Sequence, residues 1–516
     1  MLVKTFGSAI QGIIATIVTI EVSVEQGINF LLVGLPDSSV RESQQRISSA
    51  LQNYGYRIPG KKVVINMAPA DTRKEGSAYD LPLAIGILAA SQQMNADRLS
   101  DYLIMGELSL DGSVKAIKGA LSIAIEAKKQ GFKGFILPKV NAQEAAIVDG
   151  LEVYGVDTIL EVINFFNGIS GLEQIKVDVS GEFLKGLDTY EYDFAEVKGQ
   201  ENIKRAMEIA AAGSHNILLI GAPGSGKTML AKRLPSILPP LTLSEALETT
   251  KIHSVAGLMS NNTPLVSVRP FRNPHHTISD TALVGGGVYP QPGEISLAHN
   301  GVLFLDELPE FKRNVLEVLR QPMESRNITI SRTKQTSEYP ANFMFVAAMN
   351  PCACGFYNHP EKKCTCAPGA VNKYLNKVSG PLLDRIDIHI EVVPVPFKEL
   401  SESRAGEQSR VIRQRVIAAR QIQQERFKDF ADIHSNSRMT PKTMEEFCHL
   451  EPSGLELLKR AMEKLGLSAR AYNRILKVSR TIADLDGKAN IENSHLSEAI
   501  NYRSLDRDSW GETRLR

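Results

Sequence analysis

The sequence predicts an α/β protein with two α/β regions followed by a helical region. Apolar strand-like runs alternate with helix-period patterns over residues 1–170 and again over 196–397, a pattern typical of sheets covered by helices. The acidic, weakly periodic stretch 171–195 is a predicted linker, whereas 398–506 carries helix-period segments and few strand signals. Residues 507–516 are a predicted tail.

The composition is that of a soluble globular protein. The 516 residues allow roughly three domains, and 43% hydrophobic with 23% charged residues exclude a disordered chain. Because the net charge is only +1, a nucleic-acid partner would need a local basic surface. The most apolar early run, Ile13 to Val22, contains Glu21 and is about half the length of a membrane helix. With no secretion signal at the N-terminus, we expect a cytoplasmic protein and no membrane contact.

The first region contains strand and helix patterns in an order that predicts one α/β domain. Apolar runs of strand length are separated by segments whose apolar residues recur at helical spacing. The expected strands include 15–24, 62–67 and 134–138, and the expected helices include 40–54 and 81–92.

The second region starts at Val197 and predicts a helix over 200–212, a strand over 216–221 and a helix over 228–234. Between the last two lies GAPGSGKT, which matches G-x-x-x-x-G-K-[ST] in its required strand-to-helix context. Backbone N–H groups of such a turn close around phosphates, the lysine reaches the β and γ phosphates, and the hydroxyl ligates Mg²⁺. The alternative is a glycine-rich turn that binds nothing. The predicted ATP site comprises Val197, Gly221, Ala222, Pro223, Gly224, Ser225, Gly226, Lys227 and Thr228.

Two further strands of this region end in polar residues suited to hydrolysis. The strand 302–305 is followed by Asp306 and Glu307, and the strand 343–349 by Asn350. Because parallel strands present their carboxyl ends at one edge, we predict that Asp306 holds Mg²⁺ and Glu307 deprotonates the attacking water. Asn350 would position that water. The alternative for the acids is an exposed surface pair.

Two arginines complete the pattern. Arg385 lies in GPLLDRIDIHIEV and Arg470 in LSARAYNRIL. A guanidinium supplied by a neighbouring subunit stabilises charge developing on the γ-phosphate, so Arg385 is the predicted arginine finger. Arg470 would reach the phosphates of a bound nucleotide from the helical region and so report the position of that region. The alternative for each arginine is a surface salt bridge.

Four of the five cysteines are clustered in NPCACGFYNHPEKKCTCAP. Two C-x-C pairs stand nine residues apart, so one loop can bring four thiolates into a tetrahedron, which suits a structural Zn²⁺. Reduced thiols without metal and an Fe–S cluster are the alternatives, and His359 is a spare ligand candidate. The predicted ligands are Cys352, Cys354, Cys364 and Cys366.

The third region predicts a helical domain. Its periodic segments cover 408–427, 441–447, 452–465, 469–485 and 493–502.

Taken together, these motifs resemble the magnesium-chelatase-like AAA+ proteins of the ComM/YifB type. The resemblance covers nearly the whole chain and rests on segments such as RPFRNPHHTISDTALVGGG, GVLFLDELPEF, PMESRNITISR and SGPLLDRIDIHIEV. It implies a P-loop AAA+ core with a helical C-terminal lid, an ATP-driven homo-hexameric ring, and a DNA helicase or branch-migration motor in recombination and natural transformation. Single-stranded or branched DNA is the partner that it implies.

The resemblance also implies two elements that point into the ring pore, an insert over 274–293 and a hairpin over 328–340. Arg332 and Lys334 lie near the hairpin tip, where six copies would form a basic collar for a phosphate backbone. The alternative is a solvated turn. A basic helix is a weaker candidate for DNA contact, with Arg410, Arg413, Arg415 and Arg420.

The first region resembles the Lon protease domain, which has a ribosomal S5-like fold, through GELSLDGSVKAIKGALSIAIEAKKQGFKGFILP. Ser77 lies near the place of the catalytic serine, but the corresponding lysine position falls within 120–122, where no lysine occurs. We therefore expect a non-proteolytic module for DNA or subunit contact.

The alternative function is a magnesium-chelatase-type or protein-remodelling ATPase, which would use the same ATP site. The chelatase partner subunit carries a D-x-S-x-S metal motif, and the nearest match, Asp178-Val-Ser180-Gly-Glu182, lacks the second serine. This difference counts against chelation.

Overall fold

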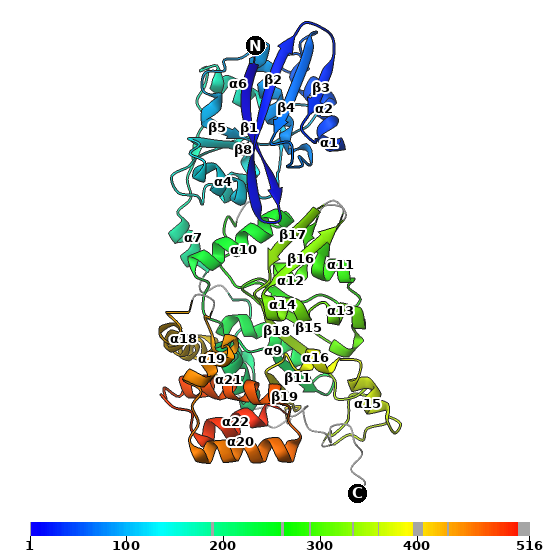
Figure 1. The fold of residues 1–516 in the computed structure, drawn as a ribbon, viewed down its shortest axis with the longest axis vertical. Coiled ribbons are helices and arrows are strands. Elements are labelled where there is room, and N and C mark those ends of the chain that lie inside the picture. Colours follow the sequence, from blue (N-terminus) through cyan, green and yellow to red (C-terminus); the bar gives the residue numbers. More distant parts are fainter. Residues whose placement is uncertain are drawn as a thin grey trace. The chain divides into compact units, whose positions relative to one another are not determined.

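The computed structural model describes residues 2–186, 190–259, 263–287, 290–332, 335–359, 361–395, 406–430 and 433–503. The chain forms two compact units (Figure 1). One contains residues 1–187 and 242–267, and the other contains 188–241 and 268–516. Residues 242–267, which lie inside the second region predicted from sequence, therefore belong to the first unit. The predicted tail, 507–516, lies outside the described residues.

The first unit is built on a mixed sheet with the strand order β10-β9-β8-β5-β1-β2-β4-β3 among its described residues. β1, β5, β8 and β9 are parallel neighbours, while β1, β2 and β4 form an antiparallel meander. The strands are β1 Leu2–Gln11, β2 Ile14–Glu25, β3 Phe30–Val33, β4 Lys62–Ala68, β5 Tyr102–Ile104, β8 Gly134–Pro138, β9 Glu152–Val156 and β10 Gln174–Ile175, with β6 Glu107–Leu108 and β7 Val114–Lys115 pairing separately.

Helices pack on this sheet. α3 is buried along its whole length and packs on β1 and β2, so its sequence is apolar on every face. α10 packs on α4, and the backbone N–H of Gly119 donates to the carbonyl of Ser254 in α10 at 3.2 Å, which explains why residues 242–267 join this unit. The helices are α1 Ser38–Arg41, α2 Ser43–Gln52, α3 Asp80–Ala90, α4 Ala120–Lys129, α5 Lys139–Ala145, α6 Ile159–Phe166, α7 Val179–Gly186 and α10 Leu243–Ala256.

The second unit contains a parallel sheet that positions the predicted ATP site. Its strand order among the described residues is β12-β15-β18-β11-β19, and every neighbouring pair is parallel. β11, β15 and β18 are buried along their length, as their continuous apolar runs predict. Their carboxyl ends therefore meet at one edge. The strands are β11 Ile217–Gly221, β12 Phe271–Arg272, β15 Val302–Leu305, β18 Met344–Met349 and β19 Ile388–Val392.

The segments around this sheet include the two elements that we expected from the family resemblance. The hairpin forms from β16 Asn327–Arg332 and β17 Gln335–Pro340, and the insert contains α11 Asp280–Val284, β13 Gly285–Gly286 and β14 Gln291–Pro292. The remaining helices are α8 Glu201–Gly213, α9 Lys227–Arg233, α12 Glu294–Leu297, α13 Arg313–Glu317, α14 Arg320–Ser325, α15 Ala370–Leu375 and α16 Gly380–Leu383.

The C-terminal region is helical, as predicted, and shares one hydrophobic core with the parallel sheet. α18 and α21 pack on α8, which follows the linker. The helices are α18 Ser409–Arg426, α19 Pro441–Phe447, α20 Pro452–Leu465, α21 Ala469–Leu485 and α22 Asn493–Asn501.

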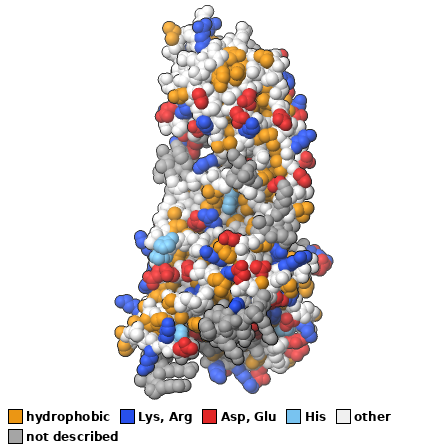
Figure 2. Space-filling view, turned by 180° about the vertical axis from the view of Figure 1, so that it is seen from behind, with side chains coloured by type: hydrophobic (Ala, Val, Ile, Leu, Met, Phe, Trp, Pro, Cys, Tyr) orange, Lys and Arg blue, Asp and Glu red, His pale blue; other side chains and the backbone are white. Residues whose placement is uncertain are grey.

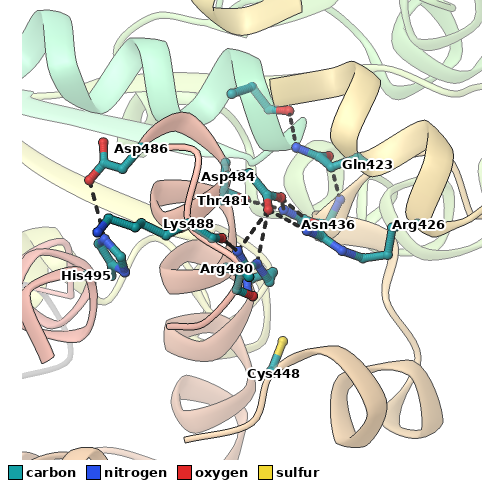
Figure 3. A network of polar contacts seen from close by, with 12 residues as sticks. Gln423, Arg426, Asn436, Cys448, Arg480, Thr481, Asp484, Asp486, Lys488 and His495 are labelled. Carbon is teal, nitrogen blue, oxygen red and sulfur yellow. Dashed lines mark hydrogen bonds and ion pairs between the residues drawn. The ribbon is translucent and has the colours of Figure 1, made fainter. Parts of the chain in front are cut away.

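A buried charge network ties the C-terminal helices together around Asp484 (Figure 3). Arg426 of α18 donates to both carboxylate oxygens of Asp484, at 2.5 and 2.8 Å. Arg480 donates to the same carboxylate at 3.1 Å, and Asn436 at 2.7 Å. Since a buried carboxylate is stable only when paired, these contacts fix α18 and α21 relative to each other.

Charge is mixed on the surface that Figure 2 presents, where Lys and Arg side chains alternate with Asp and Glu. Within the described residues, every helix is too short or too polar to cross a membrane.

Candidate nucleotide and metal sites

The GAPGSGKT turn joins β11 to α9 and has the geometry of a phosphate-binding loop. Gly226 precedes α9 with a φ of +92°, a conformation that L side chains rarely adopt. Lys227 is folded into the turn, where its Nζ donates to the carbonyl of Gly221 at 2.8 Å and to that of Ala222 at 3.0 Å. The same Nζ donates to Oδ1 of Asn350 at 3.2 Å. The sheet thus brings together a lysine and an amide that are far apart in the sequence.

Oxygen ligands for a divalent cation lie beside this lysine. The Thr228 hydroxyl donates to Oδ2 of Asp306 at 2.5 Å, and Oδ1 of Asp306 accepts from the backbone N–H of Glu307 at 2.9 Å. A hydroxyl and a carboxylate are hard ligands that suit Mg²⁺ together with phosphate oxygens. Burial lowers the pKa of Lys227, and the charges of Asp306 and Glu307 oppose this shift. The donor set therefore fits a magnesium–nucleotide complex.

Glu307 differs from Asp306 in being exposed, with 58% of its side chain accessible. Its backbone is left-handed, with a φ of +53°. Its Oε2 lies 3.2 Å from Nδ1 of His276, in the insert. The ring of His275 packs on that of His276 with centroids 4.1 Å apart. The sequence did not lead us to predict a role for His276, although the adjacent pair His275 and His276 is visible in it.

A tie between the start of this unit and the phosphate-binding turn was also missed. Gln200 donates from Nε2 to the carbonyl of Ser225 at 3.1 Å and to that of Val393, after β19, at 3.2 Å. Val197 is buried just before it. A cavity of about 290 Å³ opens here, near the lower end of small-molecule site volumes. It is lined by Gln200, Glu201, Asn202, Ile203, Glu391, Val393, Pro394 and Val395.

The two predicted arginines pair with acids of their own chain. Arg385 is 15% exposed, and its guanidinium lies 2.5 Å from Oε1 of Glu324 and donates to the carbonyl of Pro381 at 2.6 Å. Arg470, at the start of α21, is 67% exposed and lies 2.7 Å from Oδ2 of Asp384. Their roles toward a nucleotide stay predictions, because both guanidinium groups are already engaged in this single chain.

Asp387, two residues beyond Arg385, anchors this segment. It is buried, and its carboxylate accepts from the backbone N–H of Asn216 at 3.0 Å and from Arg474 at 2.7 Å. Burial raises the pKa of Asp387, but Arg474 and His215 outweigh burial and hold the pKa well below its usual range. The charged segment before β19 is therefore fixed to both the sheet and α21.

The four clustered cysteines meet as predicted. Their sulfur atoms all lie within 4.8 Å of one another. Sγ of Cys352 is 3.3 Å from that of Cys354 and 3.8 Å from that of Cys364, and Sγ of Cys354 is 3.5 Å from that of Cys364. Together with Cys366 they form a compact sulfur cluster that could hold a metal ion.

Backbone hydrogen bonds lower the pKa of individual cysteines in the cluster, and burial opposes this effect. Burial raises the pKa of Cys354, but hydrogen bonds from the backbone of Phe356 and Thr365 outweigh it and hold the pKa at about 5. Burial raises the pKa of Cys352 to about 12, while the Tyr357 backbone opposes this shift. Because metals bind thiolates, backbone donors of this kind suit a metal centre.

The spare ligand candidate, His359, does not join this cluster. Its Nδ1 accepts from the backbone N–H groups of Glu361 at 3.1 Å and Lys362 at 3.0 Å. It therefore closes a turn within the loop. The fifth cysteine, Cys448, is buried among the C-terminal helices (Figure 3).

The predicted DNA-contact residues are only partly described. The backbone of Arg332 pairs with that of Gln335 at the end of the hairpin, and Lys334 lies outside the described residues. Their contact with DNA stays a prediction.

The weaker candidate for DNA contact, the basic face of α18, is partly engaged within the chain. Arg415 lies 2.5 Å from Glu208 and 2.6 Å from Glu407, and Arg420 donates to the carbonyl of Ala211 at 3.2 Å. These contacts favour a structural role for this helix.

In the first unit, Ser77 lies beside a carboxylate. Its hydroxyl donates to Glu107, and residues 120–122 at the start of α4 supply no lysine. The nearby Lys74 is buried and donates to the carbonyl of Pro69. The Ser–Lys pair of the Lon-type mechanism is therefore not formed between Ser77 and α4.

Comparisons with known proteins agree with this geometry. The family model for magnesium chelatase subunit ChlI matches residues 193–400, a second model for subunit ChlI matches 20–141, and the model for its C-terminal part matches 406–503. Competence protein ComM of Haemophilus influenzae is 45% identical over 511 residues, which cover 97% of each chain. The chain belongs to the magnesium-chelatase-like ComM/YifB family. YifB of Escherichia coli is 46% identical over 499 residues, or 96% of each chain.

Membership in the ComM/YifB family identifies an AAA+ P-loop ATPase that uses ATP and Mg²⁺, and it confirms the predicted fold class. A chelatase subunit is a more distant relative. The magnesium-chelatase 67 kDa subunit of Heliobacterium mobile is 28% identical over 193 residues, which cover 32% of this chain and 29% of that subunit. The likeness to ComM and YifB thus extends over nearly the whole chain, whereas this likeness to a chelatase is partial.

Proposed function

We propose that this chain is a cytoplasmic, ring-forming AAA+ ATPase that couples ATP hydrolysis to translocation or branch migration on DNA. The observation that carries the proposal is the 45% identity to a competence protein over 97% of both chains. Taking up DNA and joining it to a chromosome requires single-stranded and branched intermediates. A motor that moves along such strands is the function that this likeness favours, in recombination or natural transformation.

The residues at the sheet edge would each have a role in the proposed ATP hydrolysis. Lys227 would bind the β and γ phosphates by exchanging its contacts with the turn for phosphate oxygens. Thr228 and Asp306 would hold Mg²⁺, whose chemistry at this position is to supply positive charge beside the phosphates. Glu307 would accept a proton from the attacking water, and Asn350 would orient that water. Nearly all of the catalysis is therefore positioning and electrostatic stabilisation.

Assembly into a ring, for which the resemblance implies six copies, would complete the site. Arg385 would leave Glu324 and reach the γ-phosphate bound by the next subunit, so hydrolysis would depend on assembly. In the pore, Arg332 and Lys334 of each copy would contact the phosphate backbone.

The cysteine cluster is proposed to bind one structural Zn²⁺. Four protein sulfurs leave no open coordination position, so the ion would cross-link the loop instead of acting on a substrate.

The rival is a chelatase-type or protein-remodelling ATPase. It shares the ATP site, so only the client distinguishes the two. The partial likeness to the chelatase 67 kDa subunit, set against nearly full coverage by ComM and YifB, favours the DNA motor.

The test is ATP hydrolysis by the full-length protein alone, with single-stranded DNA and with a four-way junction, at one fixed moderate salt concentration. We expect DNA to stimulate hydrolysis, with Lys227→Ala abolishing both basal and stimulated rates. A Lys232→Ala variant, which changes a lysine in the same helix, is the matched control. A hydrolysis rate that neither single-stranded DNA nor the four-way junction changes would favour the chelatase-type or protein-remodelling ATPase.

A further inference from the structure

The cysteine loop rests directly on the phosphate-binding turn. Gly355 has a φ of +85°, and a Cβ placed on it would lie 2.4 Å from Cδ and 2.8 Å from Cγ of Pro223. Since Cβ atoms essentially never approach this closely, any side chain at this position would force the two segments apart. The backbone at Gly355 therefore lies so close to the Pro223 ring that only glycine fits at this position.

A second tie joins the same two segments. Asn350, which accepts from Nζ of Lys227, is separated from Cys352 by one residue. Cys352 is buried, and its carbonyl accepts from the backbone N–H of Gly355 at 3.0 Å. A tight turn thus carries a predicted metal ligand and the contact to Pro223, and it begins two residues after the amide that accepts from Lys227.

This turn lacks regular secondary structure to hold it in place. Between β18 and α15, the described residues form turns and bends without a helix or strand. Cys354, Cys364 and Cys366 are only partly buried, so apolar packing contributes little there. Bonds from four sulfurs to one ion would supply the missing constraint.

We propose that a thiolate-binding divalent ion, with zinc as the best match, braces the ATP site through this loop. The ion fixes the turn from Cys352 to Gly355 against Pro223 and keeps Asn350 on Lys227, so metal occupancy controls ATP binding. This inference rests on the proposed ATPase function. It assigns the cysteine cluster a role in the nucleotide site of its own chain.

The first experiment measures metal and nucleotide together on the full-length protein. Zinc is counted by mass spectrometry, removed with a thiol reagent and chelator, and restored, and the affinity for a fluorescent ATP analogue is measured at each stage. We expect about one zinc per chain, an affinity at least about tenfold weaker after removal, and recovery on reloading. Circular dichroism at each stage checks that the fold persists.

A variant that keeps the metal separates the brace from general stability. Gly355→Ala retains all four cysteines but drives a Cβ into Pro223, so we expect unchanged zinc content and an ATP affinity about tenfold weaker. Gly369→Ala is the matched control, because Gly369 has a φ of +79° with no atom near its missing Cβ. Adding Pro223→Ala to Gly355→Ala should recover part of the lost affinity, since it removes the clashing ring.

The outcomes distinguish the brace from the proposed function. If the native, metal-loaded protein fails to bind or hydrolyse ATP, the proposed function is wrong. If the protein as purified hydrolyses ATP but contains no metal, or if the metal-loaded protein binds ATP equally well after verified removal of the metal, the brace is wrong. Equal affinities for Gly355→Ala and Gly369→Ala would also overturn it.

Discussion

Two regions of the second unit differ in whether their predicted site residues contact one another within one chain. They are the carboxyl edge of the parallel sheet, which carries Lys227 and Asp306, and the segment around Arg385. At the edge, the candidate side chains contact one another, with Lys227 on Asn350 and Thr228 on Asp306. In the arginine segment, Arg385 is paired with Glu324 of its own chain. The first site is assembled by the strands of one chain, whereas Arg385 would have to leave Glu324 to serve the proposed role at a neighbouring nucleotide. Binding of ATP and its hydrolysis should therefore be separable by mutation.

The largest separation is expected at Glu307. Glu307→Gln keeps the size of the side chain but removes the base, so we expect turnover to fall by about 10²–10⁴-fold with ATP affinity retained. Steady-state hydrolysis and equilibrium nucleotide binding measure the two quantities. Glu310→Gln changes a nearby glutamate that pairs with Lys377 and should leave both quantities unchanged. Retained turnover in Glu307→Gln would remove Glu307 from its assigned role.

A variant of Arg385 should also separate ATP hydrolysis from ATP binding. Arg385→Ala should lower turnover by at least about 100-fold, because a guanidinium supplied in trans stabilises transition-state charge, and ATP affinity should change little. Mixing this variant with Glu307→Gln tests the assignment of Arg385. At some interfaces of a mixed ring, the Arg385→Ala subunit supplies an intact Glu307 and its Glu307→Gln neighbour supplies an intact Arg385. Recovered hydrolysis in the mixture supports a finger acting in trans. Arg320→Ala, which removes a surface pair with Glu317, is the control.

The contrast between the two regions also explains what the sequence could reveal. The predicted ranges of α19, α20 and α21 agree with the structure to the residue. Their boundaries carry local signals, including the Thr440 and Ser468 caps, Pro441 and Pro452 at the first helical positions, and Gly466 at a C-terminus. The strand before Asp306 was equally visible, because a parallel strand buried on both faces is a continuous apolar run.

Contacts between segments far apart in sequence could not be predicted in this way. The approach of His276 to Glu307 depends on parallel pairing of β12 with β15. The pairing of Arg385 with Glu324 brings the segment after α16 to a residue of α14. Likewise, the inclusion of α10 in the first unit is decided by its packing on α4. None of these contacts leaves a periodic signal in one stretch of sequence.

A variant of His276 tests whether its contact with Glu307 positions that carboxylate for catalysis. His276→Ala removes the contact at 3.2 Å, so we expect turnover to fall about tenfold while ATP affinity is retained. The expected loss is smaller than for Glu307→Gln because the base itself remains. His275→Ala is the matched control, since Nδ1 of His275 lies 2.9 Å from the Thr277 hydroxyl. Equal losses in both variants would mean that the insert, not His276, is the sensitive element.

The smallest effect is expected at Arg470, where the predicted nucleotide contact competes with an exposed ion pair to Asp384. Arg470→Ala should change the melting temperature of the nucleotide-free protein very little, because such pairs contribute about 0–1 kcal/mol. The additional stabilisation by saturating ATP should shrink, since that stabilisation reports affinity for the folded state. Thermal melts with and without ATP measure both quantities. Arg460→Ala, which removes an exposed pair with Glu456, serves as the control. If the two variants respond equally to ATP, Arg470 is a surface ion pair and the sensing role belongs to another residue of the C-terminal helices.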